Sequence, residues 1–138
     1  MRREKILVVG ANGQIGSVLT VKLRELYGPN HVIASDVMLP VNHQGIFEIL
    51  NILDFQQLHR LVKKYRITQI YHLAAILSAK GEQNPKMAWD ININGLFNVL
   101  EVAREKKVRL FFPSSIAVFG SDTPRSNTPQ NAILHPET

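Results

Sequence analysis

The feature that most limits the possible folds is the segment GANGQIG at residues 10–16, which joins an apolar run to an amphipathic one. Residues 5–9 are rich in valine, isoleucine and leucine, as in a buried strand, and the apolar residues of 18–26 recur at mostly helical spacing until Gly28. Glycines at every third position between these runs permit a sharp turn, a close backbone approach to a pyrophosphate and tight packing of helix on strand. The lysine and Ser/Thr of a nucleotide-triphosphate loop are missing. The segment therefore predicts strand, turn and helix, and leaves open whether the turn is bare or cradles a phosphate.

The rest of the chain repeats this alternation of strand and helix. Asp54 is expected to cap a second helix, and Pro85 to open a longer one that ends near residue 107. Further strands are expected at 31–35, 46–49, 68–73 and 109–112. We therefore predict an α/β fold, a doubly wound parallel sheet of the Rossmann type with strand order 3-2-1-4-5. From about Gly120 the Ser, Thr, Asn and Pro-rich sequence indicates a loop or an active-site border.

Composition narrows the class of protein. The 138 residues fit one domain, and 45% hydrophobic with 20% charged residues is ordinary for a soluble protein. We expect a cytoplasmic location, because no segment resembles a membrane span or a secretory signal and there is no cysteine. The net charge of +5 falls largely near predicted helix ends, so no nucleic-acid partner is expected. The acidic and histidine residues lack metal-site spacing, and no metal is predicted.

An acidic residue at the end of the second predicted strand helps to decide whether the glycine turn binds a dinucleotide. Asp36 follows Gly16 by about twenty residues, where a carboxylate can accept hydrogen bonds from an adenosine ribose and repel a 2′-phosphate. This favours NAD over NADP, although Asp36 could instead only form a turn. The residues expected to meet the pyrophosphate are Gly10, Gly13, Gln14, Ile15 and Gly16.

Further candidates follow the fourth and fifth predicted strands. Ala74 and Ala75 are small enough for a flat cofactor ring to approach the backbone, or else permit helix packing. Ser114 and Ser115 place hydroxyls at the carboxyl edge where such sheets bind ligands, without the glycine-flanked elbow of a hydrolase. His72 is interpreted as a buried histidine with its hydrogen bonds satisfied.

Two asparagines interrupt the apolar pattern of the long predicted helix. Asn92 and Asn94 have only intermediate helix propensity, and a buried amide needs partners. Bonding to a neighbouring backbone segment and a functional water relay both remain open.

Taken together, GANGQIG, the dipeptide SD at 35–36, HLAA at 72–75, NING at 92–95 and PSSIAVFG at 113–120 resemble the extended short-chain dehydrogenase/reductases. Within that superfamily, the loop ILSAKGEQNP and the segment TPRSNTPQ look most like the short-chain type of L-threonine 3-dehydrogenase. Nucleotide-sugar epimerases, which usually carry a valine and a serine after HLAA, are the nearest competitors.

The resemblance implies roles for particular residues. It assigns Asp36 to the adenosine ribose and Asn51 with Ile52 to the adenine edge, although many relatives have an aspartate where Asn51 stands. It places Leu73, Ala74, Ala75 and Ser114 on the cofactor side, Ser78 and Ser115 at the substrate, and Asn92 and Ser115 among the catalytic residues.

The resemblance also implies an activity and an extent. The implied reaction is oxidation of the L-threonine 3-hydroxyl to 2-amino-3-oxobutanoate with NAD, by a full-length homodimer. The superfamily's catalytic YxxxK motif would fall just beyond Thr138, so residues 1–138 are expected to be an incomplete NAD-binding domain without its substrate cap, inactive alone. Two alternatives stay open: a nucleotide-sugar epimerase or dehydratase with tightly bound NAD, and a non-catalytic NAD-sensing or interaction module.

Overall fold

The computed structural model describes residues 4–136 and is built around one five-stranded sheet. All neighbouring strands are parallel, and their order is β3-β2-β1-β4-β5, which confirms the predicted fold and strand order. The strands are β1 (Ile6–Val9), β2 (Val32–Asp36), β3 (Phe47–Ile49), β4 (Gln69–His72) and β5 (Arg109–Phe111). Each lies within a residue or so of its expected position.

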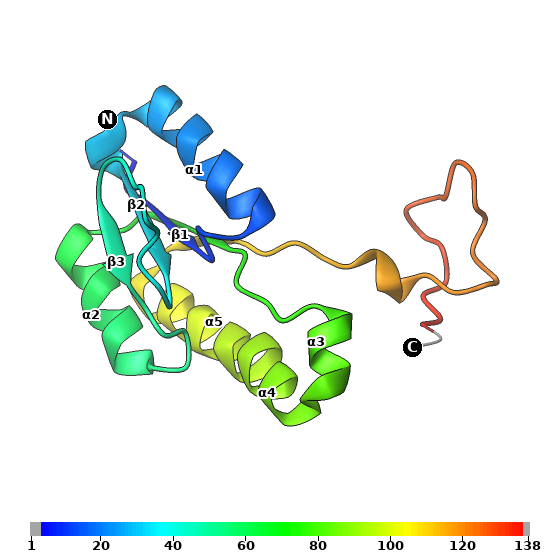
Figure 1. Ribbon diagram of the computed structural model, residues 1–138. Coiled ribbons are helices and arrows are strands. Elements are labelled where there is room, and N and C mark those ends of the chain that lie inside the picture. Colours follow the sequence, from blue (N-terminus) through cyan, green and yellow to red (C-terminus); the bar gives the residue numbers. More distant parts are fainter. Residues whose placement is uncertain (1–3, 137–138) are drawn as a thin grey trace.

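Helices cover both faces of the sheet. Figure 1 shows α1 on one face and α2 with α5 on the other. The helices are α1 (Gln14–Tyr27), α2 (Phe55–Tyr65), α3 (Ser78–Gln83), α4 (Pro85–Trp89) and α5 (Gly95–Lys106), with 3-10 turns at Pro29–His31 and Ile116–Val118. In the part of the chain that the structure describes, no helix is both long and apolar enough to cross a membrane.

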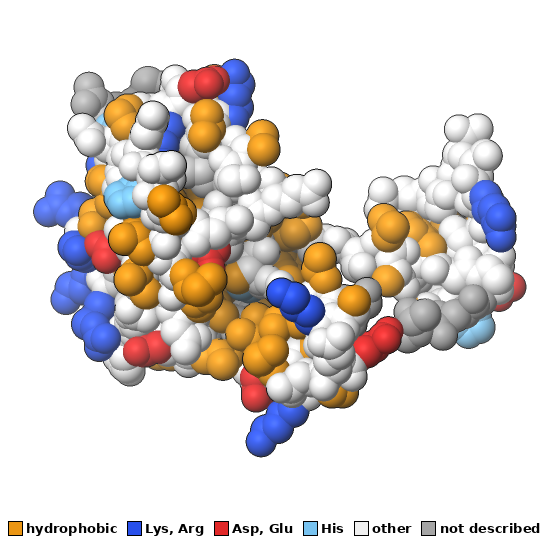
Figure 2. All heavy atoms as spheres, in the orientation of Figure 1, with side chains coloured by type: hydrophobic (Ala, Val, Ile, Leu, Met, Phe, Trp, Pro, Cys, Tyr) orange, Lys and Arg blue, Asp and Glu red, His pale blue; other side chains and the backbone are white. Residues whose placement is uncertain are grey.

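The helix ends follow the expected local chemistry. Asp54 caps α2, because its Oδ1 accepts a hydrogen bond from the Gln57 N–H at 2.8 Å. At the end of α1, Gly28 has φ +91° and donates its N–H to the Arg24 carbonyl. Basic residues occupy the last turns of α2 and α5, where they complement the helix dipoles, and Figure 2 shows Lys and Arg gathered over the α2 side of the molecule.

One long helix was expected after Pro85, and the structure differs there. The helical path is α4, then a π-helical turn at Asp90–Asn94, then α5, and α3 precedes it without having been predicted. A π turn adds a residue to one turn of helix, which rotates the residues on either side relative to each other. Apolar spacing alone does not reveal this, because the pattern remains roughly helical on both sides.

Alternate residues of β1 serve two separate cores. Leu7 and Val9 join the cluster with α2 and α5, while Ile6 and Val8 join the cluster with α1. All four side chains are buried, as expected for a central strand covered on both faces. Of the apolar residues at helical spacing in α1, Leu23 is buried whereas Val18 is 71% exposed, and the helix also buries Gly16 and Thr20.

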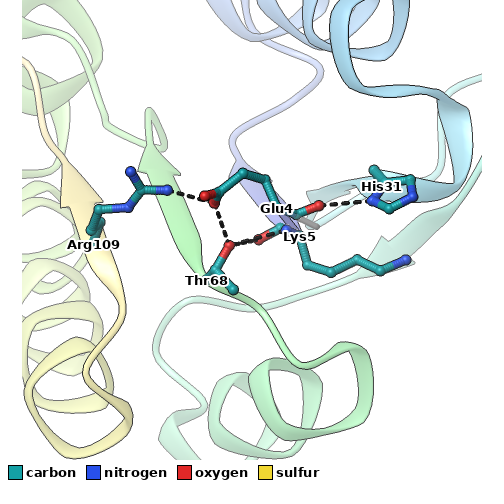
Figure 3. A network of polar contacts seen from close by, with 5 residues as sticks. All are labelled: Glu4, Lys5, His31, Thr68 and Arg109. Carbon is teal, nitrogen blue, oxygen red and sulfur yellow. Dashed lines mark hydrogen bonds and ion pairs between the residues drawn. The ribbon is translucent and has the colours of Figure 1, made fainter. Parts of the chain in front are cut away.

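A polar cluster joins the strands at the amino-terminal edge of the sheet (Figure 3). The Glu4 carboxylate accepts hydrogen bonds from the Thr68 hydroxyl at 2.7 Å and from the Arg109 guanidinium at 2.5 Å. Thr68 also accepts from the Lys5 N–H at 3.0 Å, and His31 Nδ1 lies 2.8 Å from the Glu4 carbonyl. The cluster thus ties the edge strand β5 to residues next to β1, at the end of the sheet opposite the glycine turn.

Beyond β5 the chain leaves the sheet. Residues 113–136 extend away from the two helical layers and contain only the 3-10 turn at Ile116–Val118 as regular structure (Figure 1). The loop predicted from about Gly120 is therefore confirmed.

Candidate functional site

The turn after β1 requires glycine at two positions for different reasons. Gly10 has φ +84°, and a Cβ added there would lie 2.6 Å from the Ala74 nitrogen. A Cβ on Gly16 would lie 2.1 Å from the Gly10 carbonyl oxygen, so this glycine lets α1 pack against the turn. Gly13 is the N-cap of α1, and of the described residues none caps this end with a side chain. The turn therefore presents a helix N-terminus and a backbone without side chains, which is how pyrophosphate is held in folds of this type.

The glycine turn is also bonded to β2. The Gly10 and Ala11 N–H groups both donate to the Ser35 carbonyl at 3.0 Å. The Ser35 hydroxyl is buried and donates to the Val8 carbonyl at 3.0 Å. These bonds hold the turn against the carboxyl end of β2, next to Asp36.

Asp36 connects the turn with the loop after β2. Its Oδ2 accepts from the Asn12 N–H at 2.9 Å and its Oδ1 from the Val37 N–H at 2.8 Å, while the Asn12 side chain donates to the Met38 carbonyl at 2.6 Å. The carboxylate therefore makes a local turn contact and a long-range one. Each carboxylate oxygen can accept a further hydrogen bond, so the ribose role predicted for Asp36 is compatible with both.

A cavity of about 240 Å³ lies beside the turn, at the carboxyl ends of β1, β2 and β4. Of the predicted cofactor residues, it brings together Gly10, Gly13, Asp36, Ile52, Leu73, Ala74 and Ala75. Its lining also contains residues that sequence reasoning missed, namely Val9, Val37, Leu50, Ile76 and Ile91. Ile76 and Ile91 come from the segment containing α3 and the π turn, which had not been foreseen.

Other predicted cofactor residues lie outside this lining. Gln14 and Ile15 form the exposed first turn of α1, and Gly16 is buried beneath the turn. The Asn51 Oδ1 accepts from the Leu53 N–H at 3.1 Å, so this side chain shapes the turn before α2.

Asn92 holds one wall of the cavity. Its side chain accepts from the Ile76 N–H at 2.8 Å and donates to the Ile76 carbonyl at 2.9 Å. Asn94 instead bonds Asp90 Oδ1, four residues earlier, at 2.8 Å. Sequence reasoning missed Asn98, whose amide donates to the Ile52 carbonyl at 2.9 Å. The structure contains the first of the two roles left open for Asn92, bonding to a neighbouring backbone segment, while its part in a water relay and in catalysis stays a prediction.

Comparison with known proteins places this geometry in a family. The model of the NAD dependent epimerase/dehydratase family matches residues 6–138. The chain belongs to that family. It is 47% identical over 137 residues to an uncharacterized epimerase/dehydratase of Staphylococcus saprophyticus, covering 96% of this chain and 43% of that protein.

Solved structures of similar proteins have the same fold over nearly the whole of this chain. The chain is 47% identical to an L-threonine dehydrogenase of Clostridium difficile with a TM-score of 0.92, over 99% of this chain and 44% of that one. With a nucleoside-diphosphate-sugar epimerase of Agrobacterium tumefaciens the identity is 26% and the TM-score 0.79, over 97% of this chain and 43% of that one. The chain thus spans less than half the length of the relatives that it matches.

The predicted serines of this family member lie apart from the cavity. Ser114 and Ser115 are exposed in the segment that leaves the sheet, and the Ser115 hydroxyl accepts from the Ala117 N–H at 3.1 Å. Ser78 begins α3, but its side chain lies outside the described residues. The substrate roles of Ser78 and Ser115 therefore stay predictions.

His72 is buried as predicted, but within the described part of the chain its ring nitrogens lack the hydrogen-bond partners that were expected. It is fully inaccessible to solvent, and among residues 4–136 neither ring nitrogen has a hydrogen-bond partner. Its ring stacks on Phe112 with the centroids 5.5 Å apart. Loss of solvent around the imidazole lowers the pKa of His72 to about 4, so the ring is neutral near neutral pH. The hydrogen bonds expected for His72 are therefore not found among the described residues, where its ring packs against Phe112.

Proposed function

We propose that the complete protein carrying this sequence is an NAD-dependent L-threonine 3-dehydrogenase, which oxidises the 3-hydroxyl to give 2-amino-3-oxobutanoate. The observation that carries the cofactor assignment is the glycine turn, in which a Cβ at Gly10 or Gly16 would occupy space taken by backbone, with Asp36 beside it. The substrate assignment is supported by the greater likeness to the threonine dehydrogenase than to the sugar epimerase.

In this proposal residues 1–138 form the NAD-binding part. Main-chain N–H groups at the amino end of α1 bind the pyrophosphate, and the Asp36 carboxylate accepts hydrogen bonds from the adenosine ribose. Ala74 and Ala75 leave room for the nicotinamide side. NAD, when bound, supplies the hydride acceptor.

The substrate end of the proposal rests on Ser115. Its hydroxyl would hold the threonine oxygen on which carbonyl character develops, and such a preoriented donor lowers the barrier. In the structure this hydroxyl accepts the Ala117 N–H, so its own proton is available for donation.

The activity is tested with the complete protein, NAD and L-threonine, following the absorbance of NADH. We expect NADH to form with L-threonine and the product to be 2-amino-3-oxobutanoate. Ser115→Ala should lower kcat, whereas Ser126→Ala, in the same exposed segment, should leave it unchanged. Absence of NADH with L-threonine, together with epimerisation of a nucleotide-linked sugar, would replace the proposal by the second activity of the family.

The cofactor assignment has its own test. Asp36→Ala removes a charged acceptor, a loss that typically weakens binding by roughly tenfold to a hundredfold. Calorimetry should show weaker NAD binding and less discrimination against NADP. Asp122→Ala, which removes an exposed carboxylate from the segment beyond β5, serves as the control. Equal affinities of the parent and Asp36→Ala proteins for both dinucleotides would contradict the ribose role.

A further inference from the structure

A second and larger hollow lies on the face of the sheet that carries α1. Parallel strands are usually joined by a crossover helix that covers the sheet, but residues 37–46 connect β2 to β3 without one. The loop covers the sheet incompletely and leaves a groove of about 1310 Å³ between itself and α1. Ala34 of β2 and Phe47 of β3 line it from the sheet.

Two side chains that line the groove carry buried polar atoms without hydrogen-bond partners among residues 4–136. Thr20 is only 4% exposed, and its hydroxyl has no hydrogen-bond partner within the described part of the chain. A buried helix threonine commonly bonds a carbonyl of the preceding turn, so this orphaned hydroxyl is unusual.

Arg24 follows Thr20 by one helical turn and lines the same groove. Its Nη2 donates to the Ile46 carbonyl at 2.7 Å, whereas its buried Nε has no partner among residues 4–136. Gly45 lies against the guanidinium, since a Cβ added there would be 3.1 Å from Nε. Partial burial of the guanidinium lowers the pKa of Arg24.

The remaining lining selects the class of ligand. Glu25 is already paired with Lys22 at 2.7 Å, and His43 Nδ1 lies 3.3 Å from the Gly45 carbonyl. One partly dehydrated guanidinium therefore dominates the charge, which suits a single carboxylate. Exposed apolar side chains of α1 and of the loop complete the walls, namely Val21, Met38, Leu39 and Val41.

We propose that this groove binds a small monocarboxylate with an apolar body, with its carboxylate at Arg24 and Thr20 and its body against Val21 and Phe47. The groove is distinct from the dinucleotide cavity, because the two share no lining residue among those described. Binding here does not depend on the identity of the enzyme's substrate.

The test uses the complete protein with octanoate as the probe and 1-octanol as the uncharged control. Calorimetry without NAD or threonine should show saturable octanoate binding at one site per chain, and at least roughly tenfold weaker binding of 1-octanol, because the charged hydrogen bonds are lost. Octanoate should still bind when NAD is saturating, because the two sites share no described lining residue and the ligands do not compete.

Variants locate the site. Arg24→Gln should weaken octanoate binding by about tenfold or more. Thr20→Val, which keeps the shape of the side chain and leaves the Arg24 contact with the loop intact, should weaken it by a smaller factor. Arg104→Gln on α5, across the sheet, should have no effect.

Several results would overturn the proposal. They are absence of saturable binding, equal binding of 1-octanol, competition by NAD, or full affinity in Thr20→Val and Arg24→Gln. A crystal structure of the octanoate-treated protein should show the carboxylate at Arg24. A water alone bridging Thr20 and Arg24 would show that the orphaned groups serve only the structure.

Discussion

Replacing Asn92 by alanine tests how the wall of the dinucleotide cavity is held. The side chain makes two hydrogen bonds with the backbone of Ile76, at 2.8 and 2.9 Å, in a partly buried setting. At about 1 kcal/mol for each bond, the variant should lose roughly 2 kcal/mol of unfolding free energy. Ile76 lies in the segment that lines the cavity, so NAD binding should weaken as well.

Asn94→Ala is the matched control for this experiment. Asn94 lies two residues away on the same helical path and makes one exposed contact with Asp90 Oδ1, the kind of pair worth about 0.2–0.5 kcal/mol. Both variants of the complete protein would be compared by urea unfolding and by calorimetry with NAD.

Asn92→Asp refines the experiment further. An ionised aspartate can accept from the Ile76 N–H but puts an acceptor oxygen against the Ile76 carbonyl, so Asn92→Asp should be less stable than the parent although it keeps one of the two bonds. If Asn92→Ala were no less stable than Asn94→Ala and bound NAD as tightly as the parent, the two hydrogen bonds would not hold the wall, and the reasoning would be refuted.

Three further predictions concern the glycine turn and two titrating groups. Gly10→Ala should abolish NAD binding and destabilise the fold by several kcal/mol, because positive φ costs about 1–3 kcal/mol and the clash with Ala74 adds a similar amount. Gly28→Ala also has positive φ, but its Cβ would meet only an ordinary contact with His31 at 3.8 Å, so this control should lose stability and keep NAD binding. Undiminished NAD binding by the Gly10 variant would refute this. The parent should lose about 2 kcal/mol of unfolding free energy through His72 between about pH 8 and about pH 5, because the buried ring has a lowered pKa of about 4 and only the unfolded chain takes up the proton. His72→Phe should not show this loss, and unfolding curves of equal pH dependence in the two proteins would refute it. The hydrogen bond from Thr68 lowers the pKa of Glu4, so the stability advantage of the parent over Glu4→Gln should be full at neutral pH and shrink as the carboxylate is protonated in acid, whereas a constant difference would count against that bond.

The fold could be predicted because its evidence is local. Short apolar runs, the cap at Asp54 and the glycine stop at Gly28 each act within a few residues, and alternation of strand and helix restricts the sheet to few topologies. The π turn and α3 escaped prediction because neither changes the local composition. The exposure of Val18 could not be predicted either, because helical spacing shows which residues share a face but not whether another element covers it.

Only part of the candidate site was predicted, and there is a physical reason why some of its residues could be recognised and others could not. Gly10 and Gly16 can be recognised from sequence because any side chain there would strain or clash with the turn itself. The pairing of Asn92 with Ile76, and the contact of Asn12 with Asp36, join residues from different elements, and such bonds leave no periodic trace. Ser115 was singled out by its place after the fifth strand, but its substrate role came from family resemblance alone. In the structure its position is not fixed by contact with the cavity.

Gly10 lies where the glycine turn meets both walls of the dinucleotide cavity. Its N–H donates to Ser35 at the end of β2, while its Cα lies so close to Ala74, after β4, that a Cβ would not fit. The turn is therefore held between the two walls of the cavity, one fastened through Asp36 and the other through Asn92. Since the walls meet at a residue without a side chain, a shift of either wall changes the space in which the pyrophosphate would lie. The hydrogen bonds of Asp36 and Asn92 should consequently affect NAD affinity in a coupled way, so that the effects of Asp36→Ala and Asn92→Ala on binding depart from additivity, whereas Asp122→Ala combined with Asn92→Ala remains additive.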